Sequence, residues 1–245
     1  MKKTLQKRGK IALCITAALI FIVIVGCGIY VNDYYRANEM ALKAQESTSK
    51  VTVEQSDDMT FFIPEDPSAG FIFYPGGKVE YTAYAPLLHN LAENNILCIL
   101  IEMPFNLAVL DMDAAEGIPE QFPDIDIWYI GGHSLGGSMA ASYAADNADS
   151  FEGIVLLASY STADLSESSL AVFSAYGSED NVLNMEKYKE YHSNLPDDLS
   201  ETIIEGGCHA YFGSYGTQDG DGIPTISCEE QTKETSQLLL DFFNY

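Results

Sequence analysis

From residue 57 onward, short continuous apolar runs alternate along the chain with longer segments of helical spacing. The runs are "MTFFIP", "GFIFY", "ILCILIEM", "DIWYIGG", "FEGIVLLAS", "SLAVFSAYG" and "SETIIEGG". Strands that are apolar on both faces lie inside a sheet covered on both sides, and helices between consecutive strands allow them to run parallel. We therefore predict an α/β domain over residues 57–245, with a mostly parallel central sheet and helices on both faces.

The first 31 residues differ in composition from the rest of the chain. Residues 1–10 carry five basic side chains and no acidic one, and residues 11–31 carry no charged side chain. An apolar run of this length is enough to cross a bilayer as a helix, and its basic flank stays in the cytoplasm. We expect a single-pass transmembrane anchor at 11–31, a stalk at 32–56, and the domain on the extracytoplasmic side of the cell membrane.

A second interpretation of the N-terminus stays open. The residues "IVGC" at 24–27 resemble a bacterial lipobox, in which Cys27 would be lipidated after cleavage. The apolar residues "GIYV" follow directly, where a lipoprotein usually becomes polar, so the sequence favours an uncleaved anchor. In both interpretations the domain is tethered outside the cytoplasm.

The charge of the domain limits its partners. Of 36 Asp and Glu residues 33 lie beyond residue 50, against four of the twelve Lys and Arg residues. Such a body is repelled by nucleic acid and by anionic lipid headgroups. We therefore expect no nucleic-acid partner, and a small molecule as the ligand.

The stretch "YIGGHSLGGSMA", residues 129–140, follows an apolar run and opens a small-residue helix. Gly132-His133-Ser134-Leu135-Gly136 fits G-x-S-x-G, the nucleophile elbow, in which a strained turn exposes the serine hydroxyl and the glycines remove clashing side chains. The Lys of a phosphate-binding loop and the spacing of a dinucleotide-binding loop are both absent. The pattern predicts Ser134 as a nucleophile.

A serine nucleophile needs a base that takes its proton and an acid that orients the base. In an α/β-hydrolase the acid follows the serine along the chain and the base follows the acid, each at the end of a later strand. His209 follows the strand "SETIIEGG" in a loop, and it is the candidate base. Asp180 follows "SLAVFSAYG" and is the candidate acid, with Glu179 as the alternative. We expect the side chain of His133 to point away from that of Ser134.

An oxyanion hole needs two backbone N–H donors. Leu135, next after the nucleophile, supplies one of them. The other is expected from the turn "YPGGKVE", where Gly77 is the best candidate and Lys78 the next.

No metal or cofactor is expected. The loop "TQDGDGIPT", residues 217–225, resembles the start of a calcium-binding loop. However, Ile223 and Pro224 stand where such a loop needs an oxygen ligand and a glycine. We predict a polar turn close to His209 instead. Cys208 and Cys228 are candidates for a disulfide outside the cell, and the sequence leaves open whether they pair.

Several segments together resemble a known family. They are "YPGGKVEYTAYAPLLHNLA", "EMPFNLAVL", "GGHSLGGSMAA", "YGSEDNVL" and "EGGCHAYFGSYG". In this order they are similar to the small bacterial, often membrane-anchored, dienelactone-hydrolase-like members of the α/β-hydrolase family, over residues 58–245. The resemblance implies an α/β-hydrolase fold and a serine hydrolase with the triad Ser134, Asp180 and His209. Dienelactone hydrolases proper use a cysteine nucleophile, so the serine implies ester hydrolysis.

The expected activity is therefore carboxylesterase-like cleavage of an ester-type acyl bond through an acyl-enzyme on Ser134. About ten residues separate the strand that ends near Ser159 from the one that starts near Leu170, which is too few for a large helical lid. A shallow site that prefers short acyl groups follows. The alternative is a membrane-anchored extracellular binding protein that keeps the fold without turnover.

Overall fold

The computed structural model describes residues 2–243, with side chains from residue 15 onward. The chain divides into two compact units, Met1–Tyr34 and Tyr35–Tyr245. The first unit contains helix α1, Lys2–Asn32. Within the described part of the chain, Ile15–Asn32 is the one helical segment long and apolar enough to cross a membrane.

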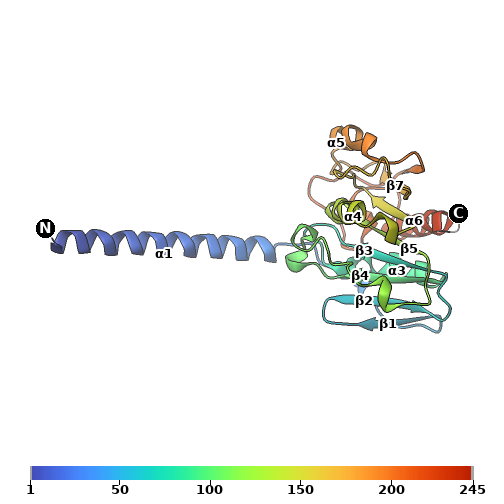
Figure 1. Cartoon of the computed structure of the whole chain (residues 1–245), viewed down its shortest axis with the longest axis horizontal. Helices are drawn as coiled ribbons and strands as arrows, with labels where there is room; N and C mark the ends of the chain where they lie inside the picture. The colour runs from blue at the N-terminus through green and yellow to red at the C-terminus, as the bar shows by residue number, and fades with distance from the viewer. Residues whose placement is uncertain (1, 244–245) are drawn as a thin grey trace. The chain divides into compact units, whose positions relative to one another are not determined.

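The second unit is built on one eight-stranded sheet, in the order β1-β2-β4-β3-β5-β6-β7-β8 (Figure 1). The strands are β1 Val51–Gln55, β2 Met59–Pro64, β3 Ala69–Tyr74, β4 Ile96–Ile101, β5 Trp128–His133, β6 Gly153–Leu157, β7 Ala171–Gly177 and β8 Leu199–Ile204. β2 is antiparallel to both its neighbours, β1 and β4, and all remaining pairs are parallel. The prediction of a mostly parallel sheet is confirmed.

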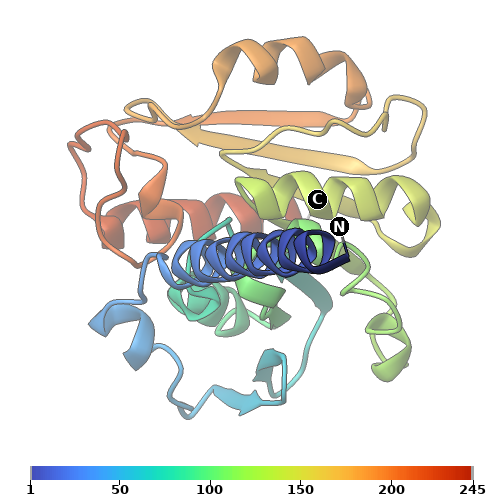
Figure 2. The same cartoon turned by 90° about the vertical axis from the view of Figure 1, so that its left-hand side faces the viewer.

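Helices cover both faces of the sheet, as expected. They are α2 Glu39–Lys43, α3 Ala85–Ala92, α4 Leu135–Asp146, α5 Met185–Glu190 and α6 Cys228–Phe243. α3 and α6 pack against each other on one face, α4 lies on the other, and α5 lies over the edge formed by β7 and β8 (Figure 2). Short 3-10 turns fill most of the remaining connections.

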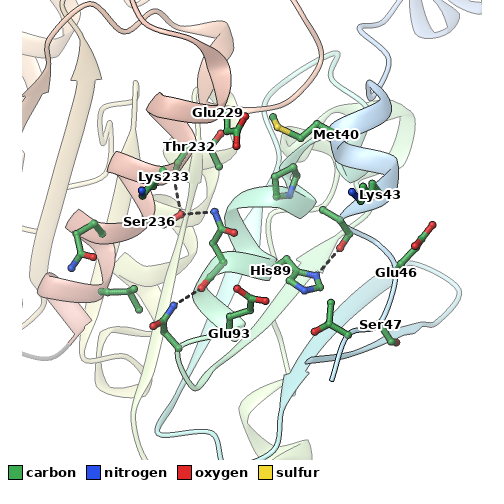
Figure 3. A pocket seen from close by; sticks show the side chains of 17 residues that line it. Met40, Lys43, Glu46, Ser47, His89, Glu93, Glu229, Thr232, Lys233 and Ser236 are labelled. Carbon is green, nitrogen blue, oxygen red and sulfur yellow. Dashed lines mark hydrogen bonds between the residues drawn. The ribbon is translucent and has the colours of Figure 1, made fainter. Parts of the chain in front are cut away.

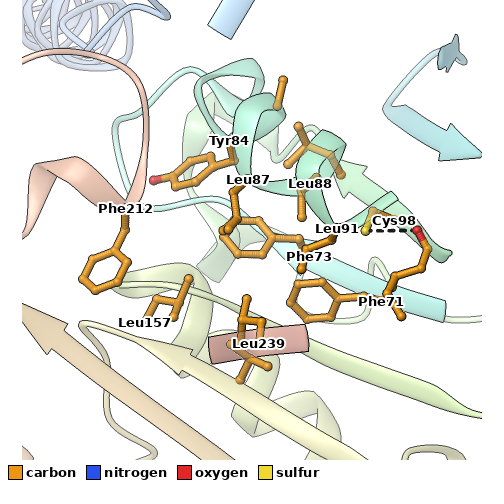
Figure 4. Packing of buried hydrophobic residues seen from close by; sticks show 14 of the residues in the cluster. Phe71, Phe73, Tyr84, Leu87, Leu88, Leu91, Cys98, Leu157, Phe212 and Leu239 are labelled. Atoms are coloured by element: carbon orange, nitrogen blue, oxygen red, sulfur yellow. Dashed lines mark hydrogen bonds between the residues drawn. The ribbon is translucent and has the colours of Figure 1, made fainter. Parts of the chain in front are cut away.

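Strand β3 shows why two cores form. Successive strand residues point to opposite faces, so Phe71 and Phe73 enter the core beneath α3 and α6. In Figure 4 they pack toward Leu91 of α3 and Leu239 of α6. Ile72 and Tyr74 enter the second core, beneath α4. Burial of apolar surface on both faces holds the ends of the parallel strands in fixed positions.

Residues 35–56 differ from the stalk that was expected at 32–56. They fold into the second unit, where β1 pairs with β2 and Val51 is buried in the core. Asn38 caps α2 by accepting hydrogen bonds from two backbone N–H groups. In "VTVEQ", residues 51–55, apolar and polar residues alternate as in an edge strand, but the polar residues at its end resemble those of a linker.

Candidate active site

The elbow lies where β5 ends and α4 begins. Ser134 has φ 52° and ψ −121°, a conformation that L-residues rarely adopt. Its N–H donates to the carbonyl of Leu157 at 2.9 Å, and the hydroxyl of Ser159 donates to its carbonyl at 2.7 Å. The strained serine is therefore fixed from both sides by β6 and the turn that follows it.

The glycines of the elbow have a steric role. A Cβ atom on Gly132 or on Gly136 would collide with the carbonyl oxygen of Tyr74, at the end of β3. The elbow is thus packed directly against the start of the turn that carries Gly77. This close approach requires the two glycines of the G-x-S-x-G pattern.

The candidate base and acid are paired. His209 Nδ1 lies 2.8 Å from Asp180 Oδ2, and both side chains are almost fully buried. Asp180 Oδ1 accepts the N–H groups of Val182 and Leu183, each at 2.8 Å, which fixes the carboxylate. A carboxylate only accepts, so Nδ1–H of His209 is the donor and Nε2 is free to receive a proton. Glu179 is not the partner of His209, since its carboxylate accepts from Ser178 instead.

A second carboxylate holds the same loop. Asp221 Oδ2 accepts Ala210 N–H at 2.8 Å, and Oδ1 accepts His209 N–H at 3.3 Å and Asn181 N–H at 3.4 Å. It therefore connects the loop of the acid with the loop of the base. The sequence predicted a polar turn near His209, which is confirmed, but it gave no reason to assign Asp221 a role.

Ser134 and His209 line the same cavity, of about 240 Å³. Its other walls come from residues that follow the ends of the parallel strands, and they are Leu135, Ser138, Ala158, Ser159, Tyr160, Val182, Leu183 and Asn184. Parallel strands bring these segments to one edge of the sheet. The cavity is large enough for a short acyl group.

The turn after β3 lies beside this cavity. A Cβ on Gly77 would lie 3.0 Å from the side chain of Leu135. The N–H of Gly77 forms no hydrogen bond within residues 2–243, whereas the N–H of Lys78 donates to Asn106 at 2.8 Å. Of the two candidates in this turn, Gly77 therefore keeps a donor that a substrate oxygen can use.

The sequence matches a known family at this point. A family model described as "Alpha/beta hydrolase family" matches residues 70–233, which is more than half of the chain. The chain belongs to the alpha/beta hydrolase family. The matched residues run from β3 to the start of α6, and they include the elbow and the loops that carry Asp180 and His209.

Solved structures share the fold of this hydrolase at low identity. TT1662 from Thermus thermophilus has a TM-score of 0.58 at 15% identity, covering 80% of this chain and 99% of that one. A predicted CIB-like hydrolase from Thermoplasma acidophilum has a TM-score of 0.56 at 15% identity, covering 78% of this chain and 97% of that one. Est1E from Butyrivibrio proteoclasticus has a TM-score of 0.55 at 13% identity, covering 80% of this chain and 100% of that one. No curated protein matches the sequence.

A second histidine of the hydrolase lies behind the base. The ring of His133 is 1% exposed, its Nδ1 lies 2.8 Å from the hydroxyl of Tyr84, and that hydroxyl accepts Gly76 N–H at 3.0 Å. Burial lowers the pKa of His133 well below its usual value, and the charge of His209 lowers it further. His133 therefore stays neutral. The sequence placed His133 away from the nucleophile and did not predict its contact with His209.

The two late cysteines are free thiols in the structure and do not form the disulfide that the sequence left open. Burial raises the pKa of Cys208 to about 12 and also raises that of Cys228. The backbone of Cys208 is held by Gln231 of α6, which accepts from its N–H and donates to its carbonyl, each at 2.9 Å. Among the described residues no group of His, Cys, Asp or Glu side chains is arranged to hold a metal ion.

A larger cavity of about 610 Å³ lies between α2, α3 and α6 (Figure 3). Lys43, Lys233 and Glu93 contribute charges of both signs to its wall. His89 donates from Nδ1 to the carbonyl of Ala44 at 2.8 Å, which fixes α2 to α3. None of the three candidate triad residues, Ser134, Asp180 and His209, lines this cavity.

Proposed function

We propose that this hydrolase cleaves an ester-type acyl bond through a covalent acyl-enzyme on Ser134. The Ser134 hydroxyl attacks the acyl carbonyl while Nε2 of His209 takes its proton. The resulting imidazolium is stabilised by Asp180. His209 then returns the proton to the leaving alcohol, and water releases the acyl group by the same route in reverse. The observation that carries this proposal is the buried 2.8 Å pair of His209 and Asp180 beside a strained serine.

The developing oxyanion lies between two backbone donors in this proposal. Leu135 N–H is at the first turn of α4, where the positive end of the helix dipole also favours negative charge. Gly77 N–H is the second donor. No cofactor takes part in the proposed reaction, because the serine and the histidine supply the nucleophile and the proton transfer.

The proposed substrate carries a short acyl group. A cavity of about 240 Å³ is below the usual size of a site for a drug-sized ligand. The segment between β6 and β7 contains no helix that could form a lid over it. Acetyl and butyryl p-nitrophenyl esters should therefore be hydrolysed faster than long-chain ones.

We further propose the topology of the chain. Residues 11–31 cross the cell membrane once, residues 1–10 stay in the cytoplasm, and the hydrolase unit is outside; the alternative is lipidation at Cys27. Protease added to intact cells should remove the unit and spare the N-terminal segment. A unit that survives in intact cells and is digested only after lysis contradicts this topology.

A fluorophosphonate probe tests the chemistry directly. The full chain in detergent should be labelled, and Ser134→Ala should not. Ser138→Ala is the matched control, because Ser138 lines the same cavity but is bonded to the carbonyl of Tyr160. An unlabelled chain, or equal labelling of Ser134→Ala, would favour the second candidate, a binding protein without turnover.

A further inference from the structure

The chain enters the hydrolase unit at the rim of the active site. Tyr35 donates its N–H to the carbonyl of Lys78 at 2.8 Å, and its own carbonyl accepts Glu80 N–H at 2.8 Å. Its hydroxyl accepts Asp219 N–H at 3.0 Å. Lys78 directly follows the proposed oxyanion donor, and Asp219 belongs to the loop of Asp221. Tyr35 is therefore fixed to two of the loops that surround the triad.

The length of the connection to the apolar helix sets a limit on distance. α1 ends at Asn32, so only Asp33 and Tyr34 precede Tyr35. Three Cα–Cα steps span at most about 11 Å when fully extended. If Ile15–Asn32 crosses a bilayer, the covalent chain alone keeps Tyr35, and with it this rim, close to the membrane surface.

The same rim carries a set of exposed apolar side chains. We call Phe105, Val109, Leu110 and Met112 the apolar patch; they are 62%, 51%, 57% and 41% exposed. The segment is attached to the oxyanion turn, because Asn106 accepts the N–H of Lys78 at 2.8 Å. Isolated exposed apolar residues are common, but four within eight positions beside a candidate active site are not explained by packing.

The backbone of this segment holds one of these side chains outward under strain. Phe105 and Asn106 have φ of 54° and 57°, and a bulky aromatic residue is seldom found in this region. On either side, Met103 and Ala108 are buried, so the segment is well anchored while the Phe105 ring points into solvent. The strained backbone at Phe105 therefore carries an exposed aromatic ring and not a buried one.

We propose that the apolar patch contacts the outer surface of the bilayer that holds α1, and that the substrate is an amphiphile of that membrane. In this arrangement the short acyl group enters the cavity of about 240 Å³ while the long apolar part of the molecule stays in the lipid. The proposal rests on the proposed esterase function and on the proposed anchor. It adds the class of substrate and the orientation of the site.

Charge restricts the lipid that the patch accepts. Residues 35–245 contain 35 of the 36 Asp and Glu residues and seven of the twelve Lys and Arg residues, and Asp111 lies within the patch segment itself. The contact therefore depends on apolar insertion and not on attraction to anionic headgroups. Binding is expected to be strongest on zwitterionic phosphatidylcholine and to weaken as phosphatidylglycerol is added.

The orientation is tested with the full chain in phosphatidylcholine nanodiscs. Phe105→Trp introduces a fluorophore into the patch, and lipids brominated on their acyl chains should quench it. Ile127→Trp is the matched control, because Ile127 is 43% exposed but lies just before the start of β5, whereas the elbow follows the end of that strand. Quenching at 105 and not at 127 supports the proposal. No quenching at 105 overturns it and leaves a protein partner as the occupant of the patch.

Turnover provides the second test. The double variant Val109→Ser and Leu110→Ser should hydrolyse hexadecyl acetate in the nanodisc about tenfold more slowly, because the patch no longer inserts. Its turnover of water-soluble p-nitrophenyl acetate and its fluorophosphonate labelling should stay as in the unchanged chain. Equal loss on both esters, or no loss on either, overturns the membrane assignment. If the unchanged chain neither hydrolyses either ester nor is labelled by the fluorophosphonate, the result contradicts the proposed function itself.

Discussion

The rings of His133 and His209 lie 4.5 Å apart between centroids, with their planes inclined by 52°. The far side of the His133 ring is hydrogen-bonded to Tyr84, whose hydroxyl also accepts the N–H of Gly76. Gly76 precedes the proposed oxyanion donor, Gly77. One buried, neutral imidazole therefore connects the candidate base with the turn that is to stabilise the oxyanion.

We predict that Tyr84→Phe slows hydrolysis more than it weakens substrate binding. The change leaves the N–H of Gly76 and Nδ1 of His133 without partners in a buried place, which costs about 1–3 kcal/mol. When about 1.4 kcal/mol of that loss appears at the transition state, kcat falls about tenfold with KM nearly unchanged. Steady-state kinetics on p-nitrophenyl acetate measure both constants. Tyr143→Phe, on α4, is the control, and a Tyr84→Phe kcat equal to that of the control contradicts the prediction.

The lowered pKa of His133 makes stability depend on pH. The folded chain keeps this imidazole neutral, whereas the unfolded chain protonates it near pH ~6.5. Below that pH the unfolded state thus binds more protons than the folded state. As the pH is lowered further, the free energy of unfolding falls by up to about 1.4 kcal/mol per pH unit. Urea unfolding at pH 7.5 and 5.5 should show a smaller loss for His133→Gln than for the unchanged chain. An equal loss in the two chains contradicts the prediction.

Asp221→Asn should impair catalysis without unfolding the chain. The amide replaces one accepting oxygen by a donor, which faces backbone N–H groups of Asn181 and His209 or of Ala210. The loop of the base then loses part of its support, and we expect kcat to fall about tenfold. Asp219→Asn lies in the same loop, where only the backbone N–H contacts Tyr35, and it should leave kcat unchanged. Thermal unfolding of both variants separates a local effect from global loss of structure.

The thiols of the hydrolase unit should be unreactive in the folded protein. Cys98, Cys208 and Cys228 all have pKa values raised by burial, so little thiolate is present at neutral pH. Ellman's reagent should find none of these three before unfolding and all three in guanidinium without reductant. If the unfolded unit yields only Cys98, a disulfide between the other two has formed, against the structure.

The sequence was sufficient to predict the sheet and the candidate triad because these depend on local patterns. The apolar runs mark the strands, and Ser134, Asp180 and His209 lie one, three and five positions after the ends of β5, β7 and β8. Two contacts that support the site could not be predicted from the sequence, since each joins segments that are distant along the chain. Tyr84 and His133 are 49 positions apart, and Asn181 and Asp221 are 40 apart.

The same limit explains the stalk. Nothing in the polar residues of 35–56 indicates that Tyr35 pairs with Lys78 and Glu80 or that β1 pairs with β2. The partners of Tyr35 lie in the turn after β3, far along the chain, whereas β1 is joined to β2 by three residues and pairs with it as a hairpin. A segment of this composition can be distinguished from a linker only when the surface against which it packs is known.

The proposed triad is distributed along the chain in a way that bears on biosynthesis. Ser134, Asp180 and His209 follow β5, β7 and β8, and the backbone next to His209 is held by Gln231 of α6. A chain made and exported from its N-terminus therefore carries its serine long before its histidine, and secures the histidine only when the last helix has emerged. If the topology and the mechanism are as proposed, a nascent polypeptide cannot attack acyl compounds along the export route before its last helix is made.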